Sequence, residues 1–327
     1  MLGVDRGSYS LKLAAFQQNR LTRLSLHKYP DWPNHSDSAA AALLSRVVAE
    51  QGATGESAWT NVKGTSAIAQ VTEFPEMSDD ELDSAVRLEV GDLLSQDVTE
   101  IDSDYDIIET LEDGRMRVLL VAAPRALGQE AIEFLSTARL YCAGVSLDSV
   151  ALASLFLETT AGTEPPASVL VNVGATTTNI VLQTGGKLRL LRDVEGGSNS
   201  ATKELMRETG MSFEEAEEMK TREDEEGPPV HGDRLQAAIQ PVARHISRTV
   251  AYQTRQGEHM DEFEIYLAGG GSRTRGLGQH LAEEFEVPVN YFDPFENVQA
   301  DCALPEEVEE RCLYGVAVGN GLMGADT

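Results

Sequence analysis

The chain has 327 residues and is strongly acidic, because 26 Lys and Arg stand against 54 Asp and Glu, a formal net charge of −28. Nucleic acids and anionic membrane surfaces are both bound through clustered basic side chains, so this balance argues against direct binding to either. Hydrophobic residues make up 41% of the chain, which is typical of a globular protein long enough for about two domains.

The sequence also indicates a compartment. No segment reaches the roughly 20 consecutive apolar residues of a membrane-spanning helix. Asp5 and Arg6 interrupt the N-terminal segment where a signal peptide would be apolar. The three cysteines form no paired motif and the six histidines are scattered, which favours free thiols over zinc or disulfides. We therefore expect a cytoplasmic protein without direct membrane insertion.

The first half of the chain opens with a β-hairpin pattern. Residues 2–6 form an apolar strand, small and hydroxyl residues form a turn, and residues 10–16 form a second strand. The elements expected after a further strand are a loop at 30–38, a helix at 38–51, strands at 58–61 and 65–71, a capped helix at 78–94, a strand pair at 105–111 and 115–123, and helices at 126–142 and 148–158.

The second half opens with a similar hairpin at 169–182. The pattern Val-Asp/Asn-x-Gly-Ser/Ala recurs, with Asp5 and Asn172 separated by 167 residues, about half the chain. This repeat predicts two related α/β domains facing one another, joined by a linker at 159–166. The elements expected after the hairpin are a strand at 187–195, helices at 198–209 and 212–220, an exposed loop at 222–233, a helix at 235–256 that Pro241 would break if it lies past the first turn, a strand at 264–268, a helix at 274–285, a strand at 287–291 and a closing helix at 306–322.

Both hairpin turns are suited to binding phosphate, because backbone N–H groups converge where Gly, Ser and Thr let the chain approach closely. In the first turn, Asp5 stands at the strand end, where it can hold a water-bound Mg²⁺. Lys12 is able to reach a phosphate from the face that it shares with Ser10. The alternative is a β-hairpin that binds no phosphate. The turn itself consists of Gly7, Ser8, Tyr9 and Ser10.

The second turn repeats this chemistry with Gly174, Ala175, Thr176 and Thr177. Its strand-end residue is Asn172, where the repeat predicts Asp. An amide can orient a metal-bound water but carries no charge, so it would hold Mg²⁺ less tightly. The alternative is that Asn172 is structural and caps the strand.

A nucleoside requires an apolar surface with a few polar anchors. The turn formed by Gly269, Gly270, Gly271 and Ser272 allows the backbone to lie against a base or sugar, because no Cβ intervenes. Glu217 and Lys220 are spaced i,i+3 on one helical face, which suits a ribose hydroxyl and a base edge. The alternatives are an ordinary turn and a solvated ion pair.

The order of these features, hairpin, hairpin, Ala-Glu-x-x-Lys helix and Gly-Gly-Gly turn, resembles the actin-like ATPase superfamily and, within it, the PilM family of type IV pilus assembly. The likeness covers nearly the whole chain, and 171–220 is its most specific part. It implies an actin-like α/β fold with two duplicated RNase-H-like domains, 1–160 and 161–327, around a nucleotide cleft. A small subdomain, about 74–121, would be inserted in the first domain.

The resemblance also implies ATP and Mg²⁺ as ligands. Asp5 and Asn172 fall where the superfamily holds Mg²⁺ through water, and Asp148 lies near the position of a water-orienting residue. Arg6 and Asn172 depart from the family pattern. Because Asn172 brings no second acid to the metal, we expect slow or absent hydrolysis. The implied nucleotide contacts are Gly7, Ser8, Tyr9, Ser10 and Lys12 in the first turn, Gly174 to Thr177 in the second, Gly197 beside it, Glu217 and Lys220 at the ribose and base, and Gly269 to Ser272 beneath the adenosine.

The inserted subdomain looks like the partner-binding element of the family. The resemblance implies a groove for the N-terminal peptide of a PilN-like membrane protein, which would recruit the chain to the inner membrane. Other pilus platform proteins and the motor ATPase are further partners that it leaves open. The alternatives are a plain surface helix at 78–94 and, for the whole chain, a small-molecule kinase, a filament-forming protein of the FtsA or MreB kind, or the cytoplasmic part of a GspL-like protein.

Overall fold

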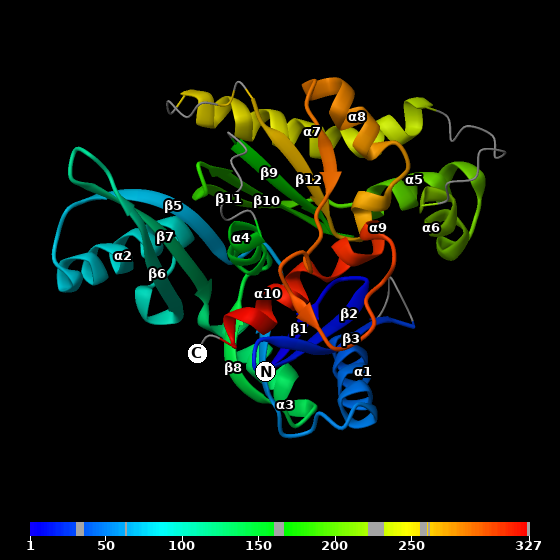
Figure 1. Cartoon of the computed structure of the whole chain (residues 1–327), viewed down its shortest axis with the longest axis horizontal. Coiled ribbons are helices and arrows are strands. Elements are labelled where there is room, and N and C mark those ends of the chain that lie inside the picture. The colour runs from blue at the N-terminus through cyan, green and yellow to red at the C-terminus, as the bar shows by residue number, and fades with distance from the viewer. Residues whose placement is uncertain are drawn as a thin grey trace.

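The computed structural model in Figure 1 describes residues 1–30, 36–62, 64–159, 167–221, 232–255, 260 and 262–325, and for 232–239 the course of the backbone alone. The linker expected at 159–166 lies almost entirely outside these residues. The same holds for most of the loop at 222–233 and for part of the loop at 30–38.

The first sheet has six strands in the order β14-β3-β2-β1-β4-β8. The hairpin of β1 and β2 pairs Asp5 with Lys12 across the two strands, whereas β4 runs parallel to β1 and β8 runs parallel to β4. The strands are β1 (Leu2–Arg6), β2 (Ser10–Gln17), β3 (Arg20–Lys28), β4 (Ser57–Asn61), β8 (Tyr141–Ser146) and β14 (Gln299–Ala300).

Alternation along β2 sends its side chains into two cores. Leu11 and Leu13 pack against α1 (Asp37–Glu50) and α3 (Arg125–Thr137) on one face. Ala14 and Phe16 face the other core, which α4 (Asp148–Thr159) and α10 (Gly315–Met323) build. Because both faces are covered, β2 is apolar over most of its length.

The second sheet has five strands in the order β11-β10-β9-β12-β13. Val169, Val171 and Ile180 pack under α7 (Gly232–Arg255) and α8 (Leu277–Phe285), whereas Leu170 and Val181 face α4. The helices α4 and α10 therefore lie between the two large sheets (Figure 1). The strands are β9 (Ala167–Val173), β10 (Thr177–Thr184), β11 (Lys187–Glu195), β12 (Glu264–Ala268) and β13 (Val289–Tyr291).

A third, antiparallel sheet, β5-β7-β6, stands beside these two with its own core. Leu82, Val86 and Val90 of α2 (Asp79–Leu94) cover it, and Ser78 with Glu81 forms the capping box at the start of that helix. Glu109 ties this sheet to the second one through ion pairs with Lys187 and Arg189 of β11. The strands are β5 (Ile68–Pro75), β6 (Ile101–Thr110) and β7 (Arg115–Pro124).

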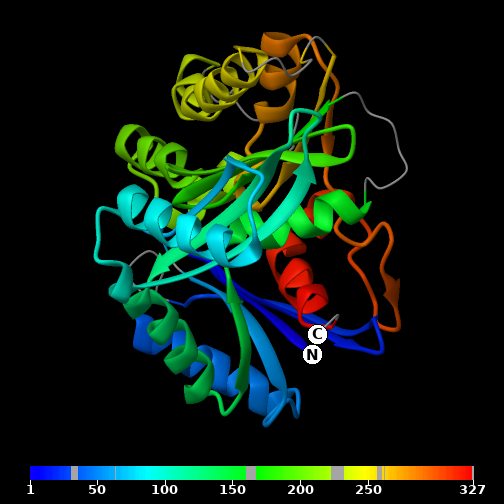
Figure 2. The same ribbon diagram turned by 90° about the vertical axis from the view of Figure 1, so that its left-hand side faces the viewer.

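The last described residues return to the first sheet. β14 pairs with β3, and α10 packs directly on β1, where a Cβ at Gly3 would lie 2.0 Å from the carbonyl oxygen of Ala317. Asn320 of α10 is fully buried and donates from Nδ2 to the carbonyl of Val4 at 3.2 Å. The two ends of the chain consequently lie side by side (Figure 2).

The structure departs from the expected elements at three places. The helix expected at 126–142 ends at Thr137, and Tyr141–Ser146 is strand β8, because its backbone pairs with β4 and the N–H of Tyr141 donates to the carbonyl of Glu56. β14 was not expected at all. Pro241 lies well inside α7 without ending it. Burial of Val242, Ala243 and Ile246, which α7 packs into the core of the second sheet, offsets the missing backbone hydrogen bond.

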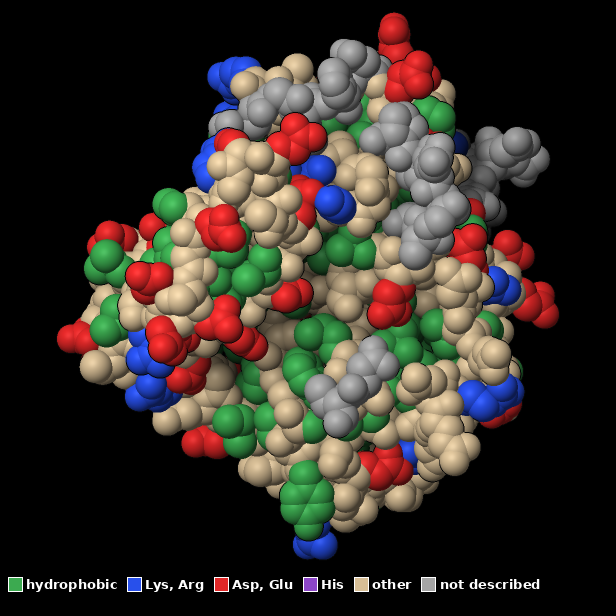
Figure 3. All heavy atoms as spheres, turned by 60° about the vertical axis from the view of Figure 1, so that its left-hand side comes forward, with side chains coloured by type: hydrophobic (Ala, Val, Ile, Leu, Met, Phe, Trp, Pro, Cys, Tyr) green, Lys and Arg blue, Asp and Glu red, His purple; other side chains and the backbone are tan. Residues whose placement is uncertain are grey.

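The acidic excess is spread over the surface. On the face shown in Figure 3, Asp and Glu side chains are dispersed among the other residues, and Lys and Arg are fewer. Among the described residues, no helix combines the length and the apolar character needed to cross a bilayer.

Candidate functional site

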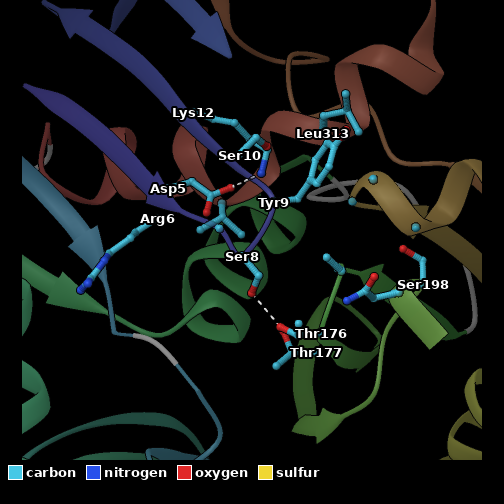
Figure 4. A pocket seen from close by; sticks show the side chains of 18 of the residues that line it. Asp5, Arg6, Ser8, Tyr9, Ser10, Lys12, Thr176, Thr177, Ser198 and Leu313 are labelled. Carbon is cyan, nitrogen blue, oxygen red and sulfur yellow. Dashed lines mark hydrogen bonds and ion pairs between the residues drawn. The ribbon is translucent and has the colours of Figure 1, made fainter. Parts of the chain in front are cut away.

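The two hairpin turns meet at a cavity of about 1250 Å³, which lies between the two large sheets. The hydroxyl oxygens of Ser8 and Thr176 are 2.6 Å apart, so the turns touch across the cavity (Figure 4). The repeat in the sequence thus corresponds to two facing loops of the same construction.

The first turn carries a buried ion pair. Lys12 Nζ donates to Asp5 Oδ2 at 2.8 Å, and both side chains border the cavity. A Cβ at Gly7 would lie 2.9 Å from the carbonyl oxygen of Ser10, so this tight turn requires glycine. The turn therefore presents backbone, hydroxyls and a cation to one space.

The second turn is held from behind by the glycine pair that follows β11. The N–H of Gly174 donates to the carbonyl of Thr177 at 2.9 Å, which closes the turn. A Cβ at Gly197 would lie 2.4 Å from the carbonyl oxygen of Gly174. Gly197 supports the turn from this side and is not on the cavity wall.

The glycine turn after β12 meets the second hairpin. Gly269 has φ +79°, and a Cβ there would lie 2.4 Å from Asn172 Oδ1, so glycine is required for both conformation and space. Ser272 is fully buried and donates to the carbonyl of Gly269 at 2.6 Å. Ser272 stabilises the turn without reaching the cavity wall, which Gly269, Gly270 and Gly271 form.

Glu217 and Lys220 of α6 (Phe213–Thr221) are not a solvated pair. Lys220 is 1% exposed, and its Nζ donates to Thr202 Oγ1 at 3.0 Å, to Ser198 Oγ at 3.2 Å and to Glu217. Burial lowers the pKa of Lys220, and the Glu217 carboxylate opposes this shift. Glu217 lines the cavity, whereas Lys220 lies behind it and joins α6 to α5 (Asn199–Thr209).

Arg6 has a structural role that the sequence does not reveal. Its guanidinium pairs with Asp37 at 2.9 Å and Glu130 at 2.8 Å and stacks 4.4 Å from the centre of the Phe134 ring. It points away from Ser8 and Thr176 (Figure 4). Arg6 therefore fastens α1 and α3 to the strand that carries the first turn.

Asp148 begins α4 on the cavity wall, where Asn61 donates to it at 2.6 Å. Burial, and after it the charges of Asp5 and Asp193, raise the pKa of Asp148 to about 8. A carboxyl group with this pKa is mostly protonated at neutral pH and acts there as a hydrogen-bond donor.

The sequence interpretation missed Asn61, Asn179 and Asp193, which also line the cavity. Asn179 lies opposite both Asn172 and Asp193 in the sheet register. The pairing of the hairpin expected at 169–182 could have placed Asn179 beside Asn172. Asp193 had no such signal, because its strand shows only the ordinary alternation of apolar and polar residues.

Of the expected residues, Gly197, Lys220 and Ser272 do not line the cavity. The others on its wall are Asp5, Gly7, Ser8, Tyr9, Ser10, Lys12, Asp148, Asn172, Gly174, Ala175, Thr176, Thr177, Glu217, Gly269, Gly270 and Gly271.

Solved structures define the class of fold. The chain is similar to the ethanolamine utilization protein EutJ from Carboxydothermus hydrogenoformans (TM-score 0.56, 13% identity, 98% of this chain and 88% of that chain). It is also similar to MreB5 of Spiroplasma citri bound to ADP (TM-score 0.51, 11% identity, 98% and 95%). Two sheets with facing hairpin turns around one cavity, in a chain with these relatives, define an actin-like α/β fold, as expected.

Within that class, a structure of the PilM-PilN type IV pilus biogenesis complex is similar with a TM-score of 0.84, at 22% identity over 100% of this chain and 98% of that one. Residues 3–323 match the family model described as type IV pilus assembly protein PilM. The chain therefore belongs to the PilM family, which confirms the resemblance in the sequence and the expected role in type IV pilus assembly.

Proposed function

We propose that this chain is a nucleotide-binding adaptor of the type IV pilus assembly platform, which binds ATP with Mg²⁺ in the cavity and the N-terminal peptide of a PilN-like membrane protein beside it. The observation that carries the nucleotide proposal is the contact between Ser8 and Thr176, which brings two glycine turns to one space. Convergent backbone N–H groups of this kind suit the phosphates of a nucleotide.

In this proposal the first turn and Lys12 hold the phosphates from one side and Gly174 to Thr177 hold them from the other. Glu217 and the turn at Gly269 bind the nucleoside. Residues 1–160 and 161–327 form the two halves around it, with α10 joined to the first half. The hydroxyl groups of Ser8 and Thr176 would exchange their mutual contact for phosphate oxygens.

The donor set fits Mg²⁺, because the Asp5 carboxylate and the Asn172 amide offer the oxygen ligands that hard cations prefer. Among the described residues, no three His, Cys, Asp or Glu side chains gather into a metal cage. The ion would therefore be held mainly by phosphates and water, with Asp5 and Asn172 as outer partners, and would neutralise phosphate charge.

Slow or absent hydrolysis follows from the same residues. Asn172 brings no charge to the ion, and Asp148 with a pKa of about 8 is a poor base at neutral pH. The cavity would then hold a bound nucleotide without hydrolysing it rapidly.

The proposed partner site is the subdomain at about 74–121. It has a separate core, and it exposes Leu88 to 68%, Val98 to 47% and Ile107 to 42%. Exposed apolar side chains on a small acidic element are suited to a peptide with apolar anchors. The full-length similarity to a PilM-PilN complex supports this choice of partner. Recruitment to the inner membrane would follow from the partner's own membrane anchor.

The nucleotide proposal is tested by titrating ATP with MgCl2 and by following single-turnover hydrolysis. Lys12→Gln removes the cation that faces the phosphates and is expected to weaken binding by about tenfold. Lys203→Gln on the exposed side of α5 makes the same charge change away from the cavity and is expected to leave affinity near that of the wild type. Lack of ATP binding by the wild-type protein, or turnover as fast as that of a kinase, would contradict the proposal.

The peptide proposal is tested with a synthetic N-terminal peptide of a PilN-like protein encoded beside this chain. Leu88→Asp and deletion of 78–94 are both expected to reduce binding. The deletion also removes the buried side chains of Leu82, Val86 and Val90, so the point variant separates lost contact from lost folding. Arg87→Gln on the same helix is the control. Unchanged binding in both variants would refute the assignment.

A further inference from the structure

A row of three polar side chains crosses the second sheet at the cavity. Asn172 on β9, Asn179 on β10 and Asp193 on β11 are direct neighbours in the strand register, with Asn179 opposite both of the others. Side chains in such a row point to the same face of the sheet. All three line the cavity between the two large sheets.

The hydrogen bonds along this row have one direction. Asn179 donates from Nδ2 to Asp193 Oδ1 at 2.7 Å, and Asn172 donates from Nδ2 to Asn179 Oδ1 at 2.7 Å. Burial raises the pKa of Asp193, and the hydrogen bonds that Asn179 and Ser149 donate to it oppose this shift and favour the carboxylate. A carboxylate only accepts, so the NH2 group of Asn179 faces it. The amide of Asn179 in turn requires the NH2 group of Asn172.

This direction determines which atom Asn172 offers to the site. Its NH2 group is used by Asn179, so its oxygen is the free end, and that oxygen lies beside the glycine turn, 2.4 Å from where a Cβ of Gly269 would stand. Without a carboxylate at the far end of the row, either amide could turn over and present a donor to the cavity instead. A donor cannot bind a cation or accept from its water.

The second oxygen of Asp193 is also engaged. Ser149 Oγ of α4 donates to Asp193 Oδ2 at 2.9 Å, which anchors the carboxylate to the helix that begins with Asp148. Asp193 is therefore held at both oxygens, by Asn179 of the second sheet and by Ser149 of the helix between the sheets. It has one orientation relative to the row.

We propose that Asp193 is the positioning residue that replaces the missing carboxylate at position 172: through Asn179 it fixes the Asn172 oxygen toward the cavity and supplies the negative charge for a divalent cation bound with a nucleotide. This inference rests on the proposed nucleotide binding and deepens it. The negative charge lies on β11, two strands away from Asn172. The hydrogen-bonded amides of Asn179 and Asn172 transmit its effect to the end of β9.

The test compares ATP affinity with MgCl2 and with EDTA for Asp193→Asn, Asn172→Asp and the double variant. Asp193→Asn keeps the shape of the side chain and is expected to weaken binding about tenfold with Mg²⁺ and hardly at all with EDTA. The double variant moves the carboxylate directly to the strand end and is expected to restore the Mg²⁺ dependence. Asn172→Asp alone is expected to bind less well than the double variant, because two carboxylates then share the row.

Glu195→Gln is the matched control, because it removes one charge from the same strand outside the row and outside the cavity wall. Thermal unfolding of each variant reports whether it is folded. Equal losses with Mg²⁺ and EDTA, or no rescue in the double variant, would mean that Asp193 is only structural. If the wild type binds no ATP, the proposed function fails. If the wild type binds ATP with Mg²⁺ dependence and Asp193→Asn does the same, only this inference fails.

Discussion

Arg6 shows how a residue inside a binding pattern can serve the scaffold. It stands between Asp5 and Gly7 of the first turn at the border of the cavity, yet its guanidinium pairs with Asp37 and Glu130 on two helices. Strand alternation explains this, because neighbouring side chains point to opposite faces. The departure from the family pattern at Arg6 therefore bears on the anchoring of α1 and α3 rather than on nucleotide contact.

Replacing Arg6 by Met tests this role. The apolar stem and the contact with Phe134 are largely kept, and Asp37 and Glu130 remain in contact with solvent, so no buried charge is stranded. We expect unfolding to become easier by about 1–2 kcal/mol and ATP affinity to stay within about twofold. Urea denaturation and nucleotide titration check the two parts, and a large loss of affinity in a stable variant would contradict the assignment.

Asp148 gives a dependence of stability on pH. Its pKa is raised from 3.8 to about 8 by burial and then by Asp5 and Asp193, so the folded state retains a proton that the unfolded state has lost. The contribution of this residue to stability is therefore greatest near pH 4 and falls as the pH rises to about 8. We expect Asp148→Asn to reduce the loss of thermal stability between pH 5 and 8. Melting curves in a pH series measure it, and parallel curves for both proteins would refute the assignment.

At the scale of elements, β11 connects the two sites of the proposal. Asp193 near its end meets the cavity, and Lys187 and Arg189 near its start pair with Glu109 of the inserted subdomain. Thr184 and Arg117 add further polar contacts around this junction. A single strand thus touches both the candidate nucleotide site and the candidate partner element.

Glu109→Gln tests the strength of that junction. Burial opposes ionisation of Glu109, but hydrogen bonds from Lys187 and Arg189 outweigh it and lower the pKa to about 2. Such a group stabilises the fold above about pH 4.5, and the effect disappears as the pH falls toward 2. We expect the variant to melt at a lower temperature at pH 7, with a gap that closes as the pH approaches 2. A gap that is equal at both pH values would show that packing, and not charge, is responsible.

The sequence predicted elements well wherever the signal is local. The strand over Lys187–Glu195 and the cap of the helix expected at 78–94 depend on neighbouring residues, and both form as expected. β8 depends on pairing with a strand about 80 residues away, and β14 on one almost 280 residues away. The role of Asp193 was not predicted for the same reason, because it depends on side chains of two neighbouring strands.

At the scale of the whole molecule, the net charge of −28 acts on stability. Acidic side chains are dispersed over the face in Figure 3 and do not gather in a single patch. Much of the excess negative charge therefore acts through mutual repulsion at the surface. We expect the melting temperature to rise by a few degrees when NaCl is increased from about 0.05 M to about 0.5 M, because salt shortens the range of this repulsion. Scanning calorimetry in NaCl and in sucrose separates screening from solvent exclusion. A melting temperature that does not rise with NaCl would contradict this expectation.

The return of α10 to the first sheet has a consequence for biosynthesis. β1 leaves the ribosome about 300 residues before α10, which contacts β1 through Gly3, Val4 and Ala317. The face of the first sheet that α4 and α10 cover is therefore incomplete while the second sheet is made, although domains usually fold in the order of synthesis. Nascent chains stalled before residue 315 should be chaperone substrates and sensitive to protease, and chains that include α10 should be protected in both halves together.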